Sequence, residues 1–189
     1  MKNLKFSVPG QMLLMAKTHL TTSFLFMILF LLTLSMAGKT RDIVFGLFGT
    51  IGYFLSIYSA AGSAYLDDKK SISPLTPKAT KGLVLPVILT VISLLLIIIY
   101  KFAWSYGANG GYLLPWAVPL NILFLLWVAP YQTFLGLANG SIALYGYLII
   151  FLTPFIASFL GYLAAFCGFD LNAKVHGIAY EKKKDKNEF

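Results

Sequence analysis

The sequence predicts an all-α fold, a polytopic integral membrane helix bundle of four to five membrane-crossing helices. The composition is 58% apolar and 12% charged, whereas about a quarter of the residues of a soluble domain are charged. Charged side chains are absent from residues 43–66, 82–100 and 102–169. Because roughly 20 apolar residues cross the hydrocarbon core as a helix, each stretch is long enough to span a bilayer.

The chain opens with a segment that we expect to lie at the membrane interface. Residues 1–18 carry Lys2, Lys5 and Lys17 and form a cytoplasmic interfacial lead-in to the first apolar segment, residues 19–37. That segment is longer than the 7 to 15 apolar residues of a signal peptide, so we expect it to be retained as an anchor. The second apolar segment, residues 43–66, follows so closely that the two should form an antiparallel hairpin.

Small residues recur at four-residue spacing on two of the apolar segments. Helices carrying such stripes can approach closely, which is the main source of helix association in lipid. The contact is either within the chain or with another subunit, and the sequence leaves both open. The predicted packing residues are Gly49, Gly52, Ser56, Ala60 and Ala64 on the second segment and Ala157, Gly161 and Ala165 on the last.

The second half of the chain contains one irregular apolar segment. A polar loop with four lysines precedes the third apolar segment, residues 82–102. Residues 113–138 are then interrupted by Pro115, Pro119 and Pro130, which predicts a broken, re-entrant segment in place of a regular helix. The last apolar segment covers residues 141–169. The single transmembrane domain therefore spans residues 19–169, and residues 170–189 form a lysine-rich tail.

The distribution of basic residues favours four crossings over five. With five crossings, the 15 basic residues divide almost equally between the two sides of the membrane. If residues 113–138 enter and leave on one side, 12 of the 15 lie on the side of both termini. Cytoplasmic loops are enriched in Lys and Arg, so this arrangement predicts cytoplasmic termini. Arg41 is the only arginine, and so high a share of lysine is typical of an AT-rich genome and favours a bacterial plasma membrane.

Several classes of function lose support from the composition. The net charge of +8 comes from lysines that flank apolar segments, so we attribute it to topology and not to nucleic-acid binding. Cys167 is the only cysteine, which excludes an intrachain disulfide and a multi-cysteine metal site. We find no catalytic constellation and expect no cofactor. The lysines of the tail either anchor the topology or bind anionic lipid headgroups.

Few polar side chains remain as candidates for chemistry inside the membrane. Apart from Lys101 at the end of the third segment, the apolar segments contain no acid and no base, and no histidine lies near the middle of a span, which argues against proton-coupled transport. Asn121 and Gln132, in the proline-broken segment, are either bridges between helices or contacts for a solute. Asp67 and Asp68 form a solvated loop end or, as the alternative, a metal site for lipid-headgroup chemistry.

Three functional hypotheses follow, in decreasing order of support. The first is a non-enzymatic membrane protein that acts as a subunit or accessory of a homo- or hetero-oligomeric complex, through its small-residue helix faces. The second is a small permease or exporter for a neutral or amphipathic solute, built around the broken segment. The third is a metal-dependent lipid-headgroup enzyme that uses Asp67 and Asp68.

Overall fold

The computed structural model describes residues 7–33, 39–70, 73, 75–110, 117–135 and 142–169. Four segments in it are long and apolar enough to cross a membrane: Val8–Leu32, Asp42–Asp68, Lys81–Trp104 and Leu144–Phe166. The predicted helical membrane bundle is thereby confirmed. The elements in chain order are α1 (Val8–Leu32), α2 (Lys39–Asp68), α3 (Lys81–Val84), α4 (Val87–Gly110), α5 (Ala117–Trp127), the 3₁₀ helix η2 (Ala129–Phe134) and α6 (Leu144–Phe166).

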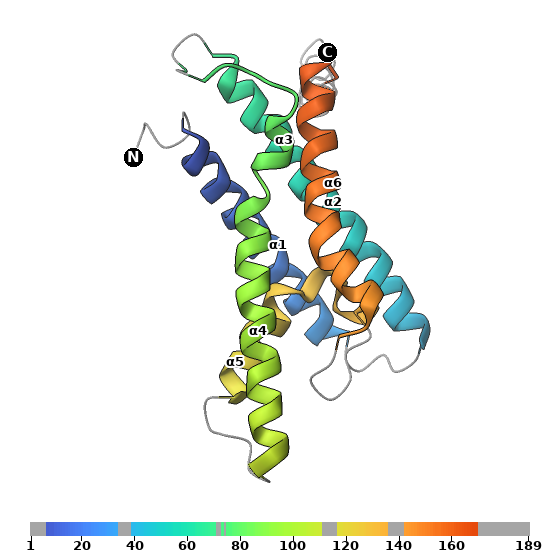
Figure 1. The fold of residues 1–189 in the computed structure, drawn as a ribbon. Helices are drawn as coiled ribbons and strands as arrows, with labels where there is room; N and C mark the ends of the chain where they lie inside the picture. Colours follow the sequence, from blue (N-terminus) through green and yellow to red (C-terminus); the bar gives the residue numbers. More distant parts are fainter. Residues whose placement is uncertain are drawn as a thin grey trace, which may run out of the picture.

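The four spans alternate in direction. Figure 1 shows α1 and α4 running down the bundle while α2 and α6 run up it, so the start of α1 and the end of α6 lie at the same end. We call this the upper end, as it is drawn in Figure 1. Helix α2 packs most extensively against α6 and also against α1, while α3 packs against α6. The interior is therefore organised around α2.

The first helix begins earlier than the apolar pattern indicates. Ser7 is its N-cap, with the side chain accepting a hydrogen bond from the backbone N–H of Gly10 at 3.2 Å, and Pro9 lies in the first turn, where its missing N–H costs nothing. Residues 8–18, which we expected to lead into the first span, thus belong to the same continuous helix. His19 consequently lies near the middle of α1 and not at its start.

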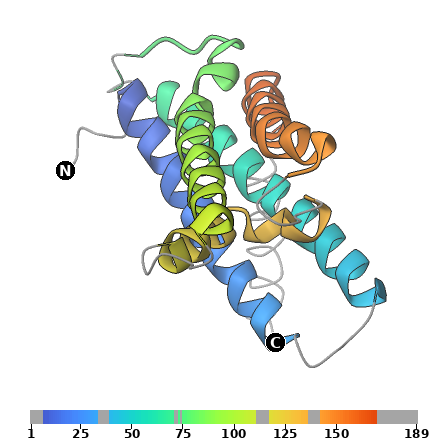
Figure 2. The same ribbon diagram turned by 60° about the horizontal axis from the view of Figure 1, so that its bottom comes forward.

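The chain between α4 and α6 enters and leaves the bundle at one end. In Figure 1, α4 ends and α6 begins at the lower end, with α5 and η2 between them. Figure 2, in which that end comes forward, shows α5 beside α4 and η2 crossing toward α6. Helix α5 is too short to span a membrane. We call residues 117–135 the re-entrant segment, and they match the re-entrant course that the prolines predicted.

Candidate functional site

The re-entrant segment is most deeply buried where α5 changes into η2. Val128 and Ala129 are 0% exposed and Trp127 is 4% exposed. Pro130 has no N–H to donate, and the N–H of Tyr131 bonds to the carbonyl of Val128 at 3.1 Å in a 3₁₀ turn. The carbonyl of Trp127 therefore lacks the backbone donor that a continuous α-helix would supply. A buried carbonyl needs another partner.

Two side chains of α1 supply that partner. His19 Nε2 lies 3.1 Å from the carbonyl oxygen of Trp127, and Ser23 Oγ donates to the same oxygen at 3.1 Å. His19 and Ser23 are four residues apart and so lie on one face of α1. Because a carbonyl oxygen only accepts, Nε2 carries the imidazole proton in the neutral ring. Helix α1 thus holds the tip of the re-entrant segment.

The other nitrogen of His19 connects this site to α2. Nδ1 lies 2.8 Å from the hydroxyl of Tyr53, which donates to it, since the proton of the neutral imidazole is on Nε2. The indole N–H of Trp127 donates to Ser93 Oγ on α4 at 2.8 Å, and the Trp127 ring lies 3.9 Å from the imidazole, centroid to centroid. We call His19, Ser23, Tyr53, Ser93 and Trp127 the His19 cluster. It joins three spans to the re-entrant segment.

His19 corrects one of our expectations from the sequence. We expected no histidine near the middle of a span, and His19 is 1% exposed near the middle of Val8–Leu32. The error came from the start of the first apolar segment: Gln11, Lys17 and Thr18 lower the local hydropathy, so the apolar run begins only at His19. The signal that could have found the true start was the Ser7 and Pro9 pair, a helix N-terminal pattern.

The contact between α2 and η2 leaves several hydroxyls without partners. Those of Thr50 on α2 and of Tyr131 and Thr133 on η2 are buried and make no hydrogen bond within the part of the chain that the structure describes. A Cβ at Gly49 would overlap the carbonyl oxygen of Pro130, and one at Gly46 would overlap Thr133 Oγ1. The two glycines allow η2 to lie directly on α2.

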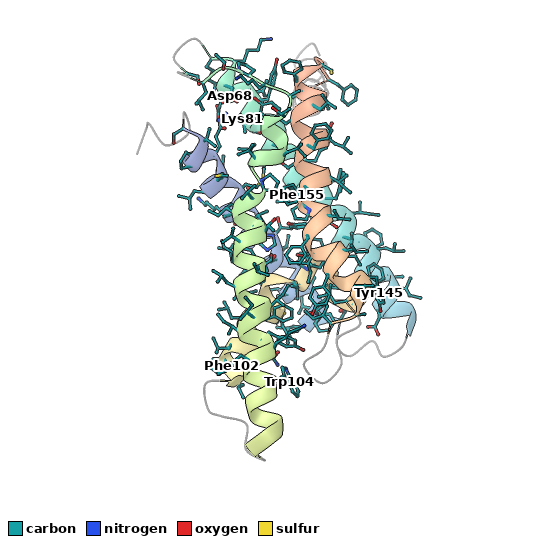
Figure 3. All side chains as sticks on the ribbon, viewed as in Figure 1. Asp68, Lys81, Phe102, Trp104, Tyr145 and Phe155 are labelled. Carbon is teal, nitrogen blue, oxygen red and sulfur yellow. The ribbon has the colours of Figure 1, made fainter. Side chains whose placement is uncertain are left out.

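A second buried polar cluster closes the upper end of the bundle. Asp68, the last residue of α2, has a side chain that is 0% exposed, and Lys81 Nζ lies 2.7 Å and 2.6 Å from its two carboxylate oxygens. Tyr162 Oη on α6 donates to Oδ2 at 2.7 Å, and Gln11 Nε2 on α1 donates to Oδ1 at 2.7 Å. Figure 3 shows Asp68 and Lys81 beside each other at this end. One carboxylate thus binds donors from the three other spans.

This arrangement corrects the expectation of a solvated loop end. Asp67 is paired with Lys70 near the surface, but Asp68 points into the bundle and is neutralised by Lys81. Adjacent helical residues face different directions, so only one of the two acids can reach the core. The described residues contain no group of three or more His, Cys, Asp or Glu side chains that could hold a metal ion.

The predicted small-residue stripes pack against other helices of the same chain, but on α2 the buried residues differ in part from the predicted ones. A Cβ at Gly161 would overlap the carbonyl oxygen of Tyr58, Ala157 is 0% exposed and Ala165 is 5% exposed, so the stripe on α6 packs on α2. On α2, Gly49 faces η2, Gly52 faces Phe26 of α1, and Ala64 is buried. Ser56 and Ala60 are only half-buried. The fully buried line of α2 is instead Tyr53, Ile57, Ala61 and Ala64.

The two proposed solute contacts lie on different parts of the re-entrant segment. Asn121 is half-buried on α5, and its neighbours Ile122 and Leu123 are 53% and 45% exposed. Gln132 is half-buried on η2, beside the fully buried Tyr131. Among the described residues, no hydrogen bond joins the side chains of Asn121 and Gln132, which lie on different elements.

Fold and site together define a helical membrane protein with a re-entrant segment held by buried polar side chains. No family model, no characterised protein and no solved structure shows a significant match to the chain. Its function is therefore inferred from the contacts within the molecule.

Proposed function

We propose that this chain is a small permease or exporter for a neutral or amphipathic solute, with the re-entrant segment forming its site. The observation that carries the proposal is the buried break at residues 127–130, where backbone leaves the α-helical pattern inside the bundle. Transporters use such discontinuous helices to offer backbone dipoles to a solute. At membrane depth, such backbone is tolerated only where protein or a watery cavity surrounds it.

The side chains around the break support a neutral solute. The hydroxyls of Thr50, Tyr131 and Thr133 are hydrogen-bonding groups that are buried and unpartnered within the described residues. The polar side chains at the break are otherwise those of the His19 cluster, and none of them is an acid, a lysine or an arginine. Asn121 on α5 and Gln132 on η2, both half-buried, remain proposed contacts.

The path for a solute requires more than one copy of the chain or a partner. Four spans seldom enclose a path alone, and α2 leaves an outward surface of large apolar side chains exposed, among them Leu47, Phe48 and Ile51. We therefore propose a homo- or hetero-oligomer. A non-catalytic subunit of a larger membrane complex is the second candidate function, and the same outward surface of α2 favours it.

We further propose that both termini are cytoplasmic in a bacterial plasma membrane. The start of α1 and the end of α6 share the upper end of the bundle, and four crossings place 12 of the 15 basic residues on that side. The lysine-rich tail, residues 170–189, lies outside the described residues. We propose that it binds anionic headgroups on the same side.

A reversible cross-link between α2 and η2 tests the permease proposal. A Cβ at Gly46 would meet the ends of the Thr133 and Phe134 side chains, so cysteines at positions 46 and 133 are close enough for a disulfide. The double variant Gly46→Cys and Thr133→Cys, in a Cys167→Ser background, is reconstituted into liposomes. Osmotic swelling is then measured with urea, glycerol and longer polyols, and efflux is measured with a neutral amphipathic dye.

We expect at least one of these solutes to cross faster than in protein-free liposomes. Oxidation should abolish that flux and a reducing agent should restore it, because the disulfide fixes the re-entrant segment to α2. Each single-cysteine variant serves as the control and should be insensitive to oxidation. If the protein that keeps Gly46 and Thr133 also moves no solute faster than empty liposomes do, the permease proposal fails, and co-purification of a stoichiometric partner then becomes the test of the subunit proposal.

A further inference from the structure

We infer that His19 is a proton-binding site, and that its protonation releases the re-entrant segment from α1 and α2. The inference concerns the site of the proposed permease and rests on that proposal for its role in transport. It contradicts our expectation from the sequence. There, the absence of a histidine near the middle of a span argued against proton coupling. A buried ionisable side chain within a span is a candidate for function because hydrocarbon disfavours its charged form.

The neutral imidazole has both nitrogens hydrogen-bonded in this structure. Nε2 donates to the carbonyl of Trp127 at 3.1 Å, and Nδ1 accepts from Tyr53 at 2.8 Å. This uses the one donor and the one acceptor that a neutral ring possesses. The closed arrangement is therefore matched to the neutral form and to a single tautomer.

A second proton cannot be added without changing these contacts. Protonation at Nδ1 would place two hydrogens between that nitrogen and the Tyr53 oxygen. The hydrogen bond must then reverse, so that Nδ1 donates and the hydroxyl of Tyr53 turns to another acceptor. Within the described residues, Tyr53 makes no other side-chain hydrogen bond. Protonation therefore keeps a contact between Nδ1 and Tyr53 but leaves the buried hydroxyl hydrogen of Tyr53 without its present acceptor, so the link between α1 and α2 must rearrange.

The surroundings of His19 offer little compensation for a positive charge. Tyr53 on α2 is the one titratable group in hydrogen-bond or ring contact with it, and Tyr131 on η2 packs edge-on against Tyr53. The elements α4 and α5 contribute Ser93 and Trp127, which carry no charge, and Lys17 on α1 is exposed. No carboxylate pairs with His19 among the described residues. Among the described residues, Trp127 is placed to stabilise an imidazolium, through its carbonyl oxygen, which accepts from Nε2, and through a cation–π contact of its ring.

The protonated form therefore favours any state in which His19 reaches water. Because the proton binds the released state better than the closed one, it shifts the population toward release. The closed state is therefore favoured at high pH, and the released state gains population as pH falls. The carbonyl of Trp127 and the hydroxyls on η2 would become accessible in the released state.

Nitrogen NMR on histidine tests whether His19 binds a proton. The second histidine, His176, is replaced in His176→Gln, so a protein labelled with ¹⁵N-histidine reports on His19 alone. In phosphatidylcholine nanodiscs at about pH 8, we expect the neutral tautomer with its proton on Nε2, and we expect conversion to the imidazolium as the pH is lowered. Tyr53→Phe should shift this transition, since it removes the donor to Nδ1. A ring that stays neutral until the protein unfolds would overturn the inference.

A spin label on η2 tests whether protonation releases the segment. The label is attached to Gln132→Cys in a Cys167→Ser background, and its accessibility to a water-soluble nickel chelate is measured over the same pH range. We expect accessibility to rise as pH falls. The matched control is His19→Gln, whose amide can keep both hydrogen bonds but cannot be charged. An equal rise in the control would show that His19 is not the cause and would overturn the inference.

The two proposals can fail separately. If His19 titrates and η2 is released, but no solute crosses the liposome membrane, the proton-site inference is supported and the permease proposal is contradicted. If the disulfide blocks solute flux but His19 stays neutral at every pH, the permease proposal is supported and the proton-site inference is contradicted.

Discussion

At the scale of single residues, the structure is determined by how buried polar atoms find partners. Asp68 is the clearest case, because its two oxygens accept hydrogen bonds from Gln11, Lys81 and Tyr162. A buried ion pair adds modest net stability compared with apolar residues, but removal of one partner leaves the other charge uncompensated. The cluster is therefore sensitive to single substitutions and tolerant of paired ones.

This reasoning predicts the effect of neutralising Asp68. Asp68→Asn keeps the shape of the side chain but leaves the Lys81 ammonium buried without its counter-charge. We expect a loss of about 3–5 kcal/mol in the free energy of unfolding. Thermal unfolding of the detergent-solubilised protein, followed by size-exclusion chromatography, measures the corresponding fall in melting temperature.

Two further variants make that prediction specific. Asp67→Asn affects a neighbouring acid near the surface and should change the melting temperature very little. The double variant Asp68→Asn and Lys81→Met removes both charges and should be more stable than Asp68→Asn alone. Equal effects of Asp67→Asn and Asp68→Asn would contradict the buried ion pair.

At the scale of elements, glycines set how closely helices approach α2. Gly161 lets α6 contact the backbone of α2 at Tyr58, and Gly49 lets the re-entrant segment do the same at Pro130. Because lipid provides little hydrophobic drive, such close contacts are a main source of helix association. The interface of α2 with α6 should therefore respond strongly to added volume.

The variant Gly161→Val tests this interface. Its Cβ would overlap the Tyr58 carbonyl, which belongs to the backbone and cannot turn away. We expect a loss of about 1–3 kcal/mol in stability, as is usual for overpacking. Urea or SDS titration of the folded fraction measures it. Leu160→Ala, at a position 42% exposed, is the control and should lose less.

At the scale of the whole molecule, the re-entrant segment decides the topology. An impermeant thiol reagent is applied to intact cells carrying single cysteines at Asn3, Ser71, Gly110, Asn139 or Asn187 in a Cys167-free background. We expect labelling at Gly110 and Asn139 and protection of the other three, because four crossings put both termini in the cytoplasm. Labelling of only one terminus would show an odd number of crossings.

Much of the fold was predictable because it depends on composition. The length of the charge-free stretches predicts the spans, and three prolines together with the lysine distribution predict the re-entrant segment. The small residues of α6 also identified a face that packs on α2. The stripe on α2 was predicted less well, because Tyr53 and Ile57 lie on its buried line and four-residue spacing of small residues does not reveal large ones.

By itself, the sequence determined the membrane class, the long apolar segments and the position of the proline break, since each follows from local hydropathy or from a missing N–H. Only the tertiary structure decided which polar groups meet. His19, Tyr53 and Trp127 are far apart along the chain, as are Gln11, Asp68 and Tyr162, and no local pattern links them. Each buried polar atom needs a partner, but helix packing selects that partner, and the candidate site is made of such pairs.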